Sequence, residues 1–287
     1  MNLLSLWKNW NAEPAAQPPA ARLKQTGPGP SLAAAPQFEI TASLLSDKGC
    51  VREINEDRCF FRHPEDAETR SRKGALAIVA DGMGGHRAGE VASEMAVRLI
   101  EQSYYESQQL PQAALEAAFH KANRAIHQAA QQQPGLSGMG TTATALVIRE
   151  GTALLAQAGD SRLYLARDGQ LYLMSEDHSA VMEMVRLGKM TLDEARLHAD
   201  KNLLLRALGP QPELRVATWK TPFPVRDGDR FLLCSDGLYD LVSDDEINQA
   251  VTNGDPQVAC QRLIESARDR GGYDNITVGV VRINVSR

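Results

Sequence analysis

The chain has 287 residues, of which 43% are hydrophobic, a length and composition that suit a globular protein with a buried core. Its 31 basic and 36 acidic residues give a formal net charge of −5, so no excess of positive charge indicates nucleic acid as a partner. An acidic pocket that binds cations is compatible with this balance of charge.

Cysteine usage and the N-terminus indicate a cytoplasmic protein. The cysteines lack the close paired spacing of a zinc site, and no secretory signal accompanies them, so we predict reduced thiols. The apolar run within the first ten residues is interrupted by Lys8 and Asn9, which makes it too short for a signal peptide or a membrane span. We therefore expect no membrane association. The four cysteines are Cys50, Cys59, Cys234 and Cys260.

The first 36 residues are predicted to be a flexible N-terminal segment and linker. Residues 11–36 hold six of the fourteen prolines and eight alanines, with little apolar periodicity. Leu3, Leu6, Trp7 and Trp10 fall at helical spacing, which fits either a small amphipathic docking element or a frayed terminus. The folded domain is predicted to cover 37–287.

Within that domain, short apolar runs alternate with longer amphipathic segments, a pattern typical of mixed α and β structure. Asp168-Gly169 lies between two apolar runs and predicts a tight type I′ hairpin, which implies antiparallel pairing. In chain order, we predict a strand at 75–80, helices at 88–103 and 112–132, strands at 143–148, 153–158, 163–166 and 170–174, a helical insertion at 179–205, a strand at 230–234, a short helix opened by a capping box at 243–246, a helix at 256–269 and a strand at 276–283.

Four aspartates stand at the ends of predicted strands. Asp81, Asp160 and Asp236 each follow an apolar strand and precede a small residue, and Asp274 comes just before the last strand. Each alone is more often a plain turn. Together they can converge on one rim of a sheet, where unscreened carboxylates repel each other unless cations bind. Oxygen ligands favour Mg²⁺ or Mn²⁺ over zinc.

A second acidic group lies upstream, where Glu56 and Asp57 follow Arg52 by four and five residues. An arginine offers a planar fork that matches phosphate oxygens, and adjacent carboxylates can add metal ligands. As a lone motif, however, this string is no better than a charged surface strand.

Seven strings follow one another along the chain. They are Arg52-x-x-Asn55-Glu56-Asp57, Val79-Ala-Asp81-Gly82-Met-Gly-Gly, Gly140-Thr141-Thr142-Ala143, Gly159-Asp160-Ser161-Arg162, Asp177-His178-Ser179, Ser235-Asp236-Gly237-Leu238 and Asp274-Asn275-Ile276-Thr277. In this order and spacing they resemble the PPM family, also called the PP2C protein phosphatases, in its bacterial stand-alone form. The likeness spans residues 46–280.

The resemblance implies an α+β fold, an α-β-β-α sandwich of two antiparallel sheets flanked by helices, with residues 179–205 as a flap. It implies that Asp81 bridges two Mn²⁺ or Mg²⁺ ions and that the Gly82 carbonyl binds one of them. Asp236 and Asp274 would complete the first ion's shell. The second ion would be held by Glu56 and Asp57, partly through water, and a looser third ion by Asp160 with Asp236.

The activity implied is that of a protein serine/threonine phosphatase, a phosphoric monoester hydrolase in which the ions activate water against phosphorus. Arg52 would bind the phosphate, and we name Arg52, Asp81 and Asp236 as the catalytic residues. The expected partners are proteins phosphorylated on Ser or Thr, within a pathway that opposes a Ser/Thr kinase. We expect a monomer in the cytoplasm, with neither nucleic acid nor membrane as a partner.

The sequence departs from many eukaryotic relatives at Met83, where those relatives carry a histidine thought to protonate the leaving oxygen. The acid is therefore unassigned, and His86 is a weaker candidate. For both His86 and His178, a local hydrogen bond that fixes a loop is an equally good interpretation. No cysteine has an arginine six residues later, so the sequence does not fit a thiol phosphatase.

Two alternatives remain open at this point. A catalytically inactive relative that binds phosphoproteins would be expected to lack carboxylates, yet all four strand-end aspartates are present. A hydrolase of small phosphate esters or nucleotides is the other alternative, although the chain has no Gly-x₄-Gly-Lys-Ser/Thr loop. For the flap, with Met182, Met184 and Met190, contact with the substrate protein and a plain helical cover are equally compatible with the sequence.

Overall fold

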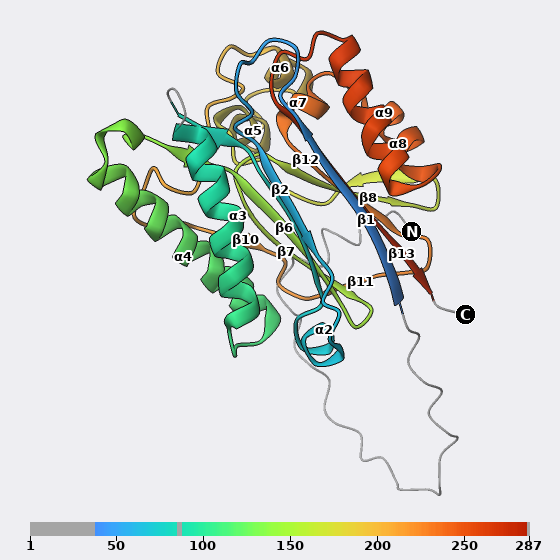
Figure 1. Ribbon diagram of the computed structural model, residues 1–287. Helices are drawn as coiled ribbons and strands as arrows, with labels where there is room; N and C mark the ends of the chain where they lie inside the picture. The colour runs from blue at the N-terminus through green and yellow to red at the C-terminus, as the bar shows by residue number, and fades with distance from the viewer. Residues whose placement is uncertain (1–37, 85–87, 286–287) are drawn as a thin grey trace, which may run out of the picture.

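The computed structural model describes residues 38–84 and 88–285, and the predicted N-terminal segment and linker at 1–36 therefore lie outside the described residues. Two antiparallel sheets form the centre of the molecule, with helices on both outer faces (Figure 1). One sheet has the order β1-β13-β12-β8-β9, the other β10-β7-β6-β3-β2 with β11 paired to β7, and β4 pairs with β5 separately. The predicted sandwich of two antiparallel sheets is confirmed.

Most strands are short, although β1 and β13 have ten residues each, and each strand pairs antiparallel with its neighbours. Their bounds are β1 Phe38–Asp47, β2 Arg58–Arg62, β3 Ala75–Ala80, β4 Gly82–Met83, β5 Gly140–Thr141, β6 Ala143–Arg149, β7 Thr152–Ala158, β8 Arg162–Arg167, β9 Gln170–Leu173, β10 Ala217–Thr218, β11 Phe223–Pro224, β12 Arg230–Cys234 and β13 Ile276–Val285. The helices are α2 Ala67–Lys73, α3 Ala88–Glu106, α4 Pro111–Gln132, α5 Ala180–Arg186, α6 Leu192–Leu197, α7 Asp236–Tyr239, α8 Asp244–Thr252 and α9 Pro256–Asp269, with a 3₁₀ turn at Pro134–Leu136.

Three apolar clusters hold the layers together. One lies between the pair α3 and α4 and the sheet that contains β3 and β6, where Tyr104 and Phe119 are fully buried. A second joins α8 and α9 to the other sheet. The third fills the space between the two sheets and includes Val79, Leu165 and Phe231, all fully buried. Burial of apolar surface on both faces of each sheet explains why the central strands read as nearly continuous apolar runs.

Local sequence signals set several element boundaries as predicted. Asp168 and Gly169 have φ of 54° and 76°, as a type I′ turn requires, and they join β8 to β9. Ser243 forms a capping box with Glu246 at the start of α8. Strands β3 and β12 and helix α9 have the predicted bounds, and the other predicted strands and helices shift by one to three residues at their ends.

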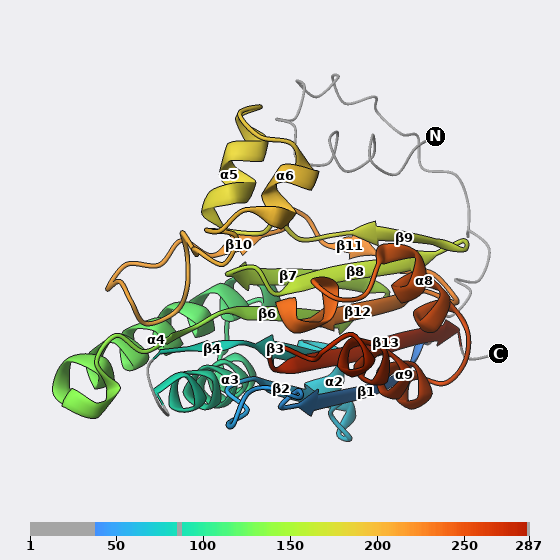
Figure 2. The same ribbon diagram turned by 90° about the horizontal axis from the view of Figure 1, so that it is seen from above.

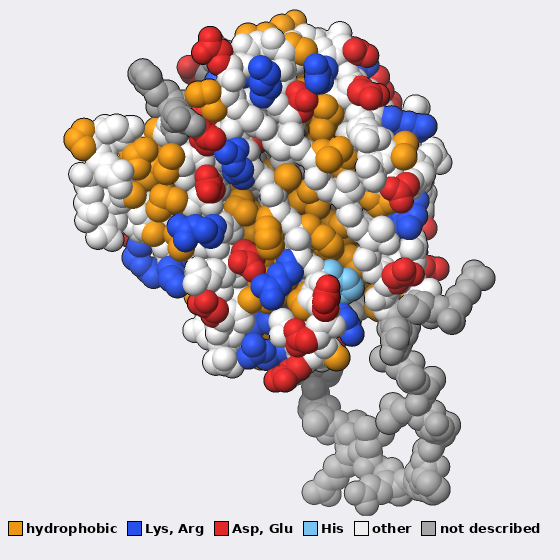
Figure 3. All heavy atoms as spheres, in the orientation of Figure 1, with side chains coloured by type: hydrophobic (Ala, Val, Ile, Leu, Met, Phe, Trp, Pro, Cys, Tyr) orange, Lys and Arg blue, Asp and Glu red, His pale blue; other side chains and the backbone are white. Residues whose placement is uncertain are grey.

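Elements without a strong pattern were not predicted from the sequence. Strand β1 lies at a sheet edge with half-buried side chains, so its alternation is weak. Strand β2 lies at an edge of the other sheet, and its side chains are also mostly half-buried. The two-residue strands and the four-residue helix α7 are too short for any periodicity. The edges β1 and β2 lie side by side, and on this face hydrophobic side chains gather between the sheets, while acidic and basic side chains intermingle around them (Figure 3).

The flap contains α5 and α6, which stand away from the two sheets beside β9 (Figure 2). Both ends of this insertion return to one place, since the Ala180 amide donates to the Leu203 carbonyl and the Leu205 amide to the His178 carbonyl. The prediction of a helical insertion outside the sheets is confirmed. Among the helices of the described ranges, none has the length and apolar character needed to cross a bilayer.

Candidate metal centre

A cavity of roughly 210 Å³ lies where the strand ends of the two sheets meet. It brings together seven of the eight residues predicted to bind metal or phosphate, and of these eight only Asp57 does not line it. The lining consists of Arg52, Glu56, Asp81, Gly82, Met83, Gly84, Thr142, Asp160, Asn202, Leu204, Asp236, Asp274 and Asn275. The convergence of strand-end carboxylates that the sequence suggested is therefore present in the fold.

Asp81 follows β3 directly, and two threonines fix its backbone. The Asp81 amide donates to Thr142 Oγ1 (2.9 Å), and the Asp81 carbonyl accepts from the Thr142 amide (2.8 Å) and the Thr141 hydroxyl (2.9 Å). Gly82 comes next, where a Cβ atom would lie 2.2 Å from the Gly89 carbonyl oxygen. Any larger residue would push Asp81 away from the start of α3.

Asp236 opens α7 immediately after β12, with Ser235 at the N-cap. The next residue is again a glycine that nothing larger could replace, because a Cβ atom on Gly237 would meet the Asn275 carbonyl oxygen at 2.0 Å. Asp160 lies in the turn from β7 to β8 and is 7% exposed. These two carboxylates therefore reach the cavity from neighbouring strands of one sheet, since β12 pairs with β8.

Asn275 holds the acidic string near Arg52 to the start of β13, a role that the sequence analysis missed. Its side-chain oxygen accepts from the Glu56 amide (2.8 Å), and its amide group donates to the carbonyls of Lys48 and Ile54 (both 3.0 Å). The signal was present in the string Asp274-Asn275, but hydrogen bonds across more than 200 residues cannot be read from spacing. Asp274 itself accepts from Arg52 Nη2 at 2.7 Å.

Asp57 lies behind the cavity and is 1% exposed. One of its oxygens accepts from the Ser235 hydroxyl at 2.7 Å, and the other has no hydrogen-bond partner. Burial raises the pKa of Asp57 to about 6, against the opposing effect of the Ser235 hydrogen bond. Asp57 is therefore less able to bind an ion directly than the carboxylates that line the cavity.

The cavity lining brings five carboxylates together with a single arginine, Arg52. Burial raises the pKa of Asp81 and Asp236 well above the usual range, and the nearby carboxylates of Asp57 and Asp160, respectively, raise them further. Burial, followed by the Asp177 carboxylate, raises the pKa of Asp160 to about 7. Carboxylates forced together in this way ionise readily only when cations share the site.

The donor set suits hard divalent cations. Three buried carboxylate oxygens at the site, Glu56 Oε1, Asp57 Oδ1 and Asp236 Oδ1, have no hydrogen-bond partner. Buried oxygens are rarely left in that state unless something outside the protein binds them. In the part of the chain that is described, no three His, Cys, Asp or Glu side chains already stand together as a cage for one ion. The orphan oxygens show that the residues fit Mn²⁺ or Mg²⁺.

Of the residues considered as acids or nucleophiles, His178 and Cys59 are placed by the structure in roles other than catalysis. Met83 lines the cavity, and His86 lies outside the described residues. His178 Nδ1 accepts from the Gly159 amide at 3.1 Å, and burial lowers the pKa of His178 to about 4, so the neutral ring fixes a turn. Burial raises the pKa of Cys59 to about 11, which keeps it a protonated thiol.

Comparison with known proteins assigns the family. Residues 52–270 match the family described as Protein phosphatase 2C. The chain is 38% identical over 250 residues to the serine/threonine phosphatase stp of Listeria innocua, covering 85% of this chain and 96% of that protein. It is 40% identical over 241 residues to the serine/threonine protein phosphatase PstP of Mycobacterium tuberculosis, covering 83% of this chain and 44% of PstP.

The fold leads to the same relatives. The crystal structure of the catalytic domain of PstP in complex with two manganese ions superposes with a TM-score of 0.75 at 37% identity, covering 86% of this chain and all of that one. The cavity described above thus occurs in a chain whose sequence and fold both match these phosphatases. This protein belongs to the protein phosphatase 2C family.

Proposed function

We propose that the chain hydrolyses phosphoserine and phosphothreonine in proteins with the help of Mn²⁺ or Mg²⁺ held at the cavity. The observation that carries this proposal is the convergence of Asp81, Asp160, Asp236 and Asp274 from four strand ends around one cavity, with buried carboxylate oxygens left without partners. A purely structural cluster would be expected to satisfy those oxygens within the protein.

The proposed ligand roles follow the family resemblance. Asp81 would bridge two ions, with the Gly82 carbonyl on one of them. Asp236 and Asp274 would complete the first shell, and Glu56 and Asp57 would hold the second ion, in part through water. Asp160 with Asp236 would hold a third. Their oxygen-only chemistry supports hard cations, and the manganese-bound PstP structure supports two of the ions.

The chain's own groups would then position the phosphoryl group. When bound, the cations supply the positive charge that activates water as a nucleophile and stabilises the phosphoryl oxygens. Arg52 lies at the rim with its side chain 49% exposed, paired with Asp274, so its guanidinium can turn one edge toward an incoming phosphate. Gly82 and Gly84 line the cavity without side chains, which lets a phosphate ester approach the backbone.

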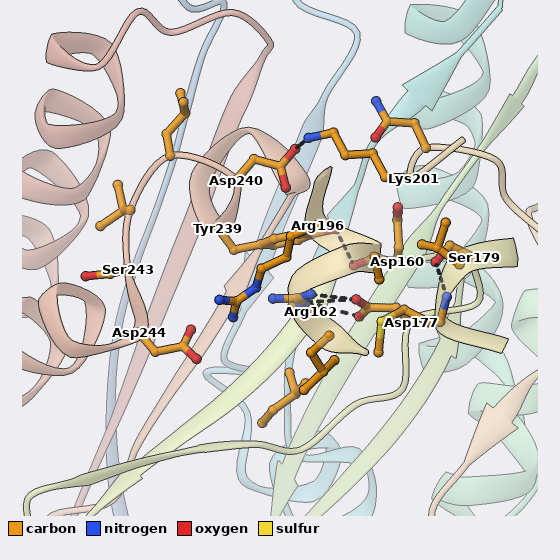
Figure 4. Close-up of a pocket in the computed structure, with 18 of the residues that line it drawn as sticks. Asp160, Arg162, Asp177, Ser179, Arg196, Lys201, Tyr239, Asp240, Ser243 and Asp244 are labelled. Carbon is orange, nitrogen blue, oxygen red and sulfur yellow. Dashed lines mark hydrogen bonds and ion pairs between the residues drawn. The ribbon is translucent and has the colours of Figure 1, made fainter. Parts of the chain in front are cut away.

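The substrate is proposed to be a folded or extended protein that also contacts the flap. A cleft of roughly 620 Å³ lies between α5, α6 and the segment from α7 to α8, and it shares Asp160 and Asn202 with the metal cavity (Figure 4). Of the eleven exposed large hydrophobic side chains in the described residues, six lie in the flap. They are Met184, Leu187, Leu192, Leu197, Leu203 and Leu205.

Exposed apolar side chains grouped beside a cavity are typical of protein-binding surfaces.

The proposal also includes a monomeric enzyme of the cytoplasm that opposes a Ser/Thr kinase, with neither nucleic acid nor membrane as a partner. Its support is the naming of the relatives as serine/threonine phosphatases and the composition of the chain.

The decisive experiment measures phosphate release from a phosphothreonine peptide with Mn²⁺, and again after chelation. We expect activity only with the ion, and a loss in Asp81→Asn of at least about 100-fold, since that change misplaces both the ions and the nucleophile. Asp160→Ala should be slower than wild type but less impaired than Asp81→Asn. Full turnover in chelator would defeat the metal mechanism. Mn²⁺ binding without turnover in the wild type would instead favour the inactive, phosphoprotein-binding alternative.

The flap contact has its own test, in which Leu192 and Leu197 are both changed to Ser. We expect kcat/KM to fall several-fold for a phosphoprotein and to stay unchanged for a small phosphate ester. Leu110→Ser is the matched control, since Leu110 is also exposed but precedes α4, away from the cleft. Equal ratios of the two activities in all three proteins would leave the flap as a helical cover.

A further inference from the structure

Arg162 is a largely buried arginine at the base of the flap, two residues after Asp160 and at the first position of β8. Its guanidinium donates three bonds of 2.7–3.1 Å to the Asp177 carboxylate and one of 2.9 Å to the Tyr164 hydroxyl. The side chains of Arg162 and Asp177 are only 14% and 4% exposed. Arg162 and Asp177 therefore form a bidentate ion pair that is largely shielded from solvent.

The same guanidinium lies over the ring of Tyr239, at 3.6 Å from the ring centre. Tyr239 ends α7, the helix that Asp236 begins, and its hydroxyl donates to the Asp160 carbonyl at 3.3 Å. Figure 4 shows Arg162 between Asp177 and Tyr239, with Asp160 beside them. One side chain is therefore in contact with the groups that hold both Asp160 and Asp236.

The flap joins the same group. His178, the neighbour of Asp177, donates its amide to the Gly159 carbonyl and accepts the Gly159 amide on its ring (both 3.1 Å). Its carbonyl accepts the amide of Leu205 at the far end of the flap. The two ends of the flap thus meet at the turn that carries Asp160.

Stability alone does not account for such a pair. Removing two charges from water costs several kcal/mol per ion, and apolar residues of similar volume are often as stabilising as a buried ion pair. What the fork and the stacked ring add is orientation, because a bidentate arginine over an aromatic ring has one arrangement. Groups that hold metal ligands are known to control metal affinity in this way.

We propose that Arg162 is a positioning residue for the metal centre. Through Asp177 and Tyr239 it holds Asp160 and the helix of Asp236 at the spacing that an ion shared by these two carboxylates requires, and it fixes the flap to them. This inference rests on the proposed function, in which Asp160 and Asp236 are ligands. Arg162 does not line the metal cavity, so its proposed role is to position the groups that do.

The same strand carries a matched control. Arg167, at the other end of β8, donates to both Asp229 oxygens at 2.7 and 2.6 Å, and these two side chains are 4% and 1% exposed. Its guanidinium also lies over an aromatic ring, that of Phe223, at 5.0 Å. The two pairs share their chemistry, both are largely buried, and neither lines the metal cavity. They differ in that Arg162 contacts Tyr239, which bonds to Asp160 and ends the helix that Asp236 begins.

The experiment compares Arg162→Lys with Arg167→Lys in the full chain. Mn²⁺ binding is measured by titration calorimetry, and stability by thermal unfolding in chelator. Both variants should lose the fork and unfold at lower temperature. Only Arg162→Lys should bind Mn²⁺ more weakly, by about 10- to 100-fold at the most affected site, and need correspondingly more Mn²⁺ for half-maximal phosphate release.

Asp177→Asn provides a second variant if Arg162→Lys does not fold, since it keeps the shape and one acceptor but removes the charge. It too should weaken Mn²⁺ binding. Mn²⁺ affinity equal to wild type in a folded Arg162→Lys or Asp177→Asn, or an equal loss in Arg167→Lys, would overturn the positioning role. If the wild type does not bind Mn²⁺, the proposed function is wrong and this inference fails with it. The titration of the wild type alone therefore distinguishes this failure from a failure of the positioning role.

Discussion

Arg52 pairs with Asp274 at the metal cavity, and we propose that it also binds the substrate phosphate. In the fold it bonds to Asp274 at 2.7 Å, and both side chains remain partly exposed, at 49% and 33%. An exposed pair of this kind contributes little to stability, because water screens both charges. Its exposure at the rim of a cavity lined by carboxylates leaves the guanidinium accessible to a phosphate, as the proposed function requires. The pairing also keeps the guanidinium near the place where a phosphate would arrive.

For Arg52→Ala we expect KM to rise and kcat to fall toward a phosphothreonine peptide, with Mn²⁺ affinity preserved. Arg52→Lys should recover only part of the loss, since a point charge cannot reproduce the planar fork. Steady-state kinetics and calorimetry on the three proteins check this. Identical kinetics in all of them would make Arg52 a surface residue with no part in phosphate binding.

At the scale of elements, the cavity depends on close contacts where strand ends meet helix starts. Gly82 faces the backbone of α3, and Gly237 at the start of α7 faces the backbone before β13. Neither contact involves a flexible side chain that could move aside. Short elements such as β4 and α7 therefore have fixed positions despite having few residues of their own.

Gly82→Ala and Gly237→Ala should each lower the free energy of unfolding by about 1–3 kcal/mol or more, since the added methyl group meets backbone oxygen atoms. Gly135→Ala is the control, because nothing lies within 4 Å of a Cβ atom there. It should change stability by less than about 0.5 kcal/mol. Urea unfolding of the three variants measures this, and equal stabilities would mean that the backbone yields at these contacts.

At the scale of the whole molecule, ion binding and folding stability are linked. Burial raises the pKa values of Asp57 and Asp160 to about 6 and 7 in the ion-free fold, above those of an unfolded chain. The stability that these two groups contribute is therefore fully present below the unfolded pKa, near 4, and is lost as the pH rises toward 7. Cations reverse this, because they bind the ionised carboxylates.

We therefore expect Mn²⁺ to raise the melting temperature, and the rise to be larger at pH 7.5 than at pH 5, where protons compete for the same oxygens. The measurement is a thermal scan with Mn²⁺ and with chelator at each pH, compared as a difference. His178, whose pKa burial lowers to about 4, acts in the opposite direction but is common to both scans and cancels. If the rise in melting temperature is the same at both pH values, the carboxylates are not the groups that bind Mn²⁺.

The proposed boundary near residue 37 leads to a further expectation for the whole chain. Removal of residues 1–36 should leave turnover of a small phosphate ester within about twofold of the full chain, since a Pro/Ala-rich segment lacks the apolar pattern needed to pack on the domain. Thermal unfolding of the truncated protein should likewise match. A large drop in either quantity would make the segment part of the fold.

The sequence alone determined the elements with strong local signals and the residue types of the site. Strand β3 is an uninterrupted apolar run and β12 is apolar after Arg230, the hairpin at Asp168 needs positive φ, and α8 and α9 begin at capping residues. Seven ordered strings also gave the family, because a site built from strand ends leaves short, recognisable motifs.

Only the tertiary structure decided which groups meet. The hydrogen bond from the Glu56 amide to the Asn275 side chain, the burial of Asp57 behind the cavity, and the contacts of Arg162 with Asp177 and Tyr239 join segments 15 to 219 residues apart. The edge strand β1 was not predicted for a related reason, because it pairs with β13 at the other end of the chain. The local sequence pattern indicates which secondary structure a segment favours. The burial of a side chain, its interaction with other charges and its orientation are set only when distant segments pack together and exclude water.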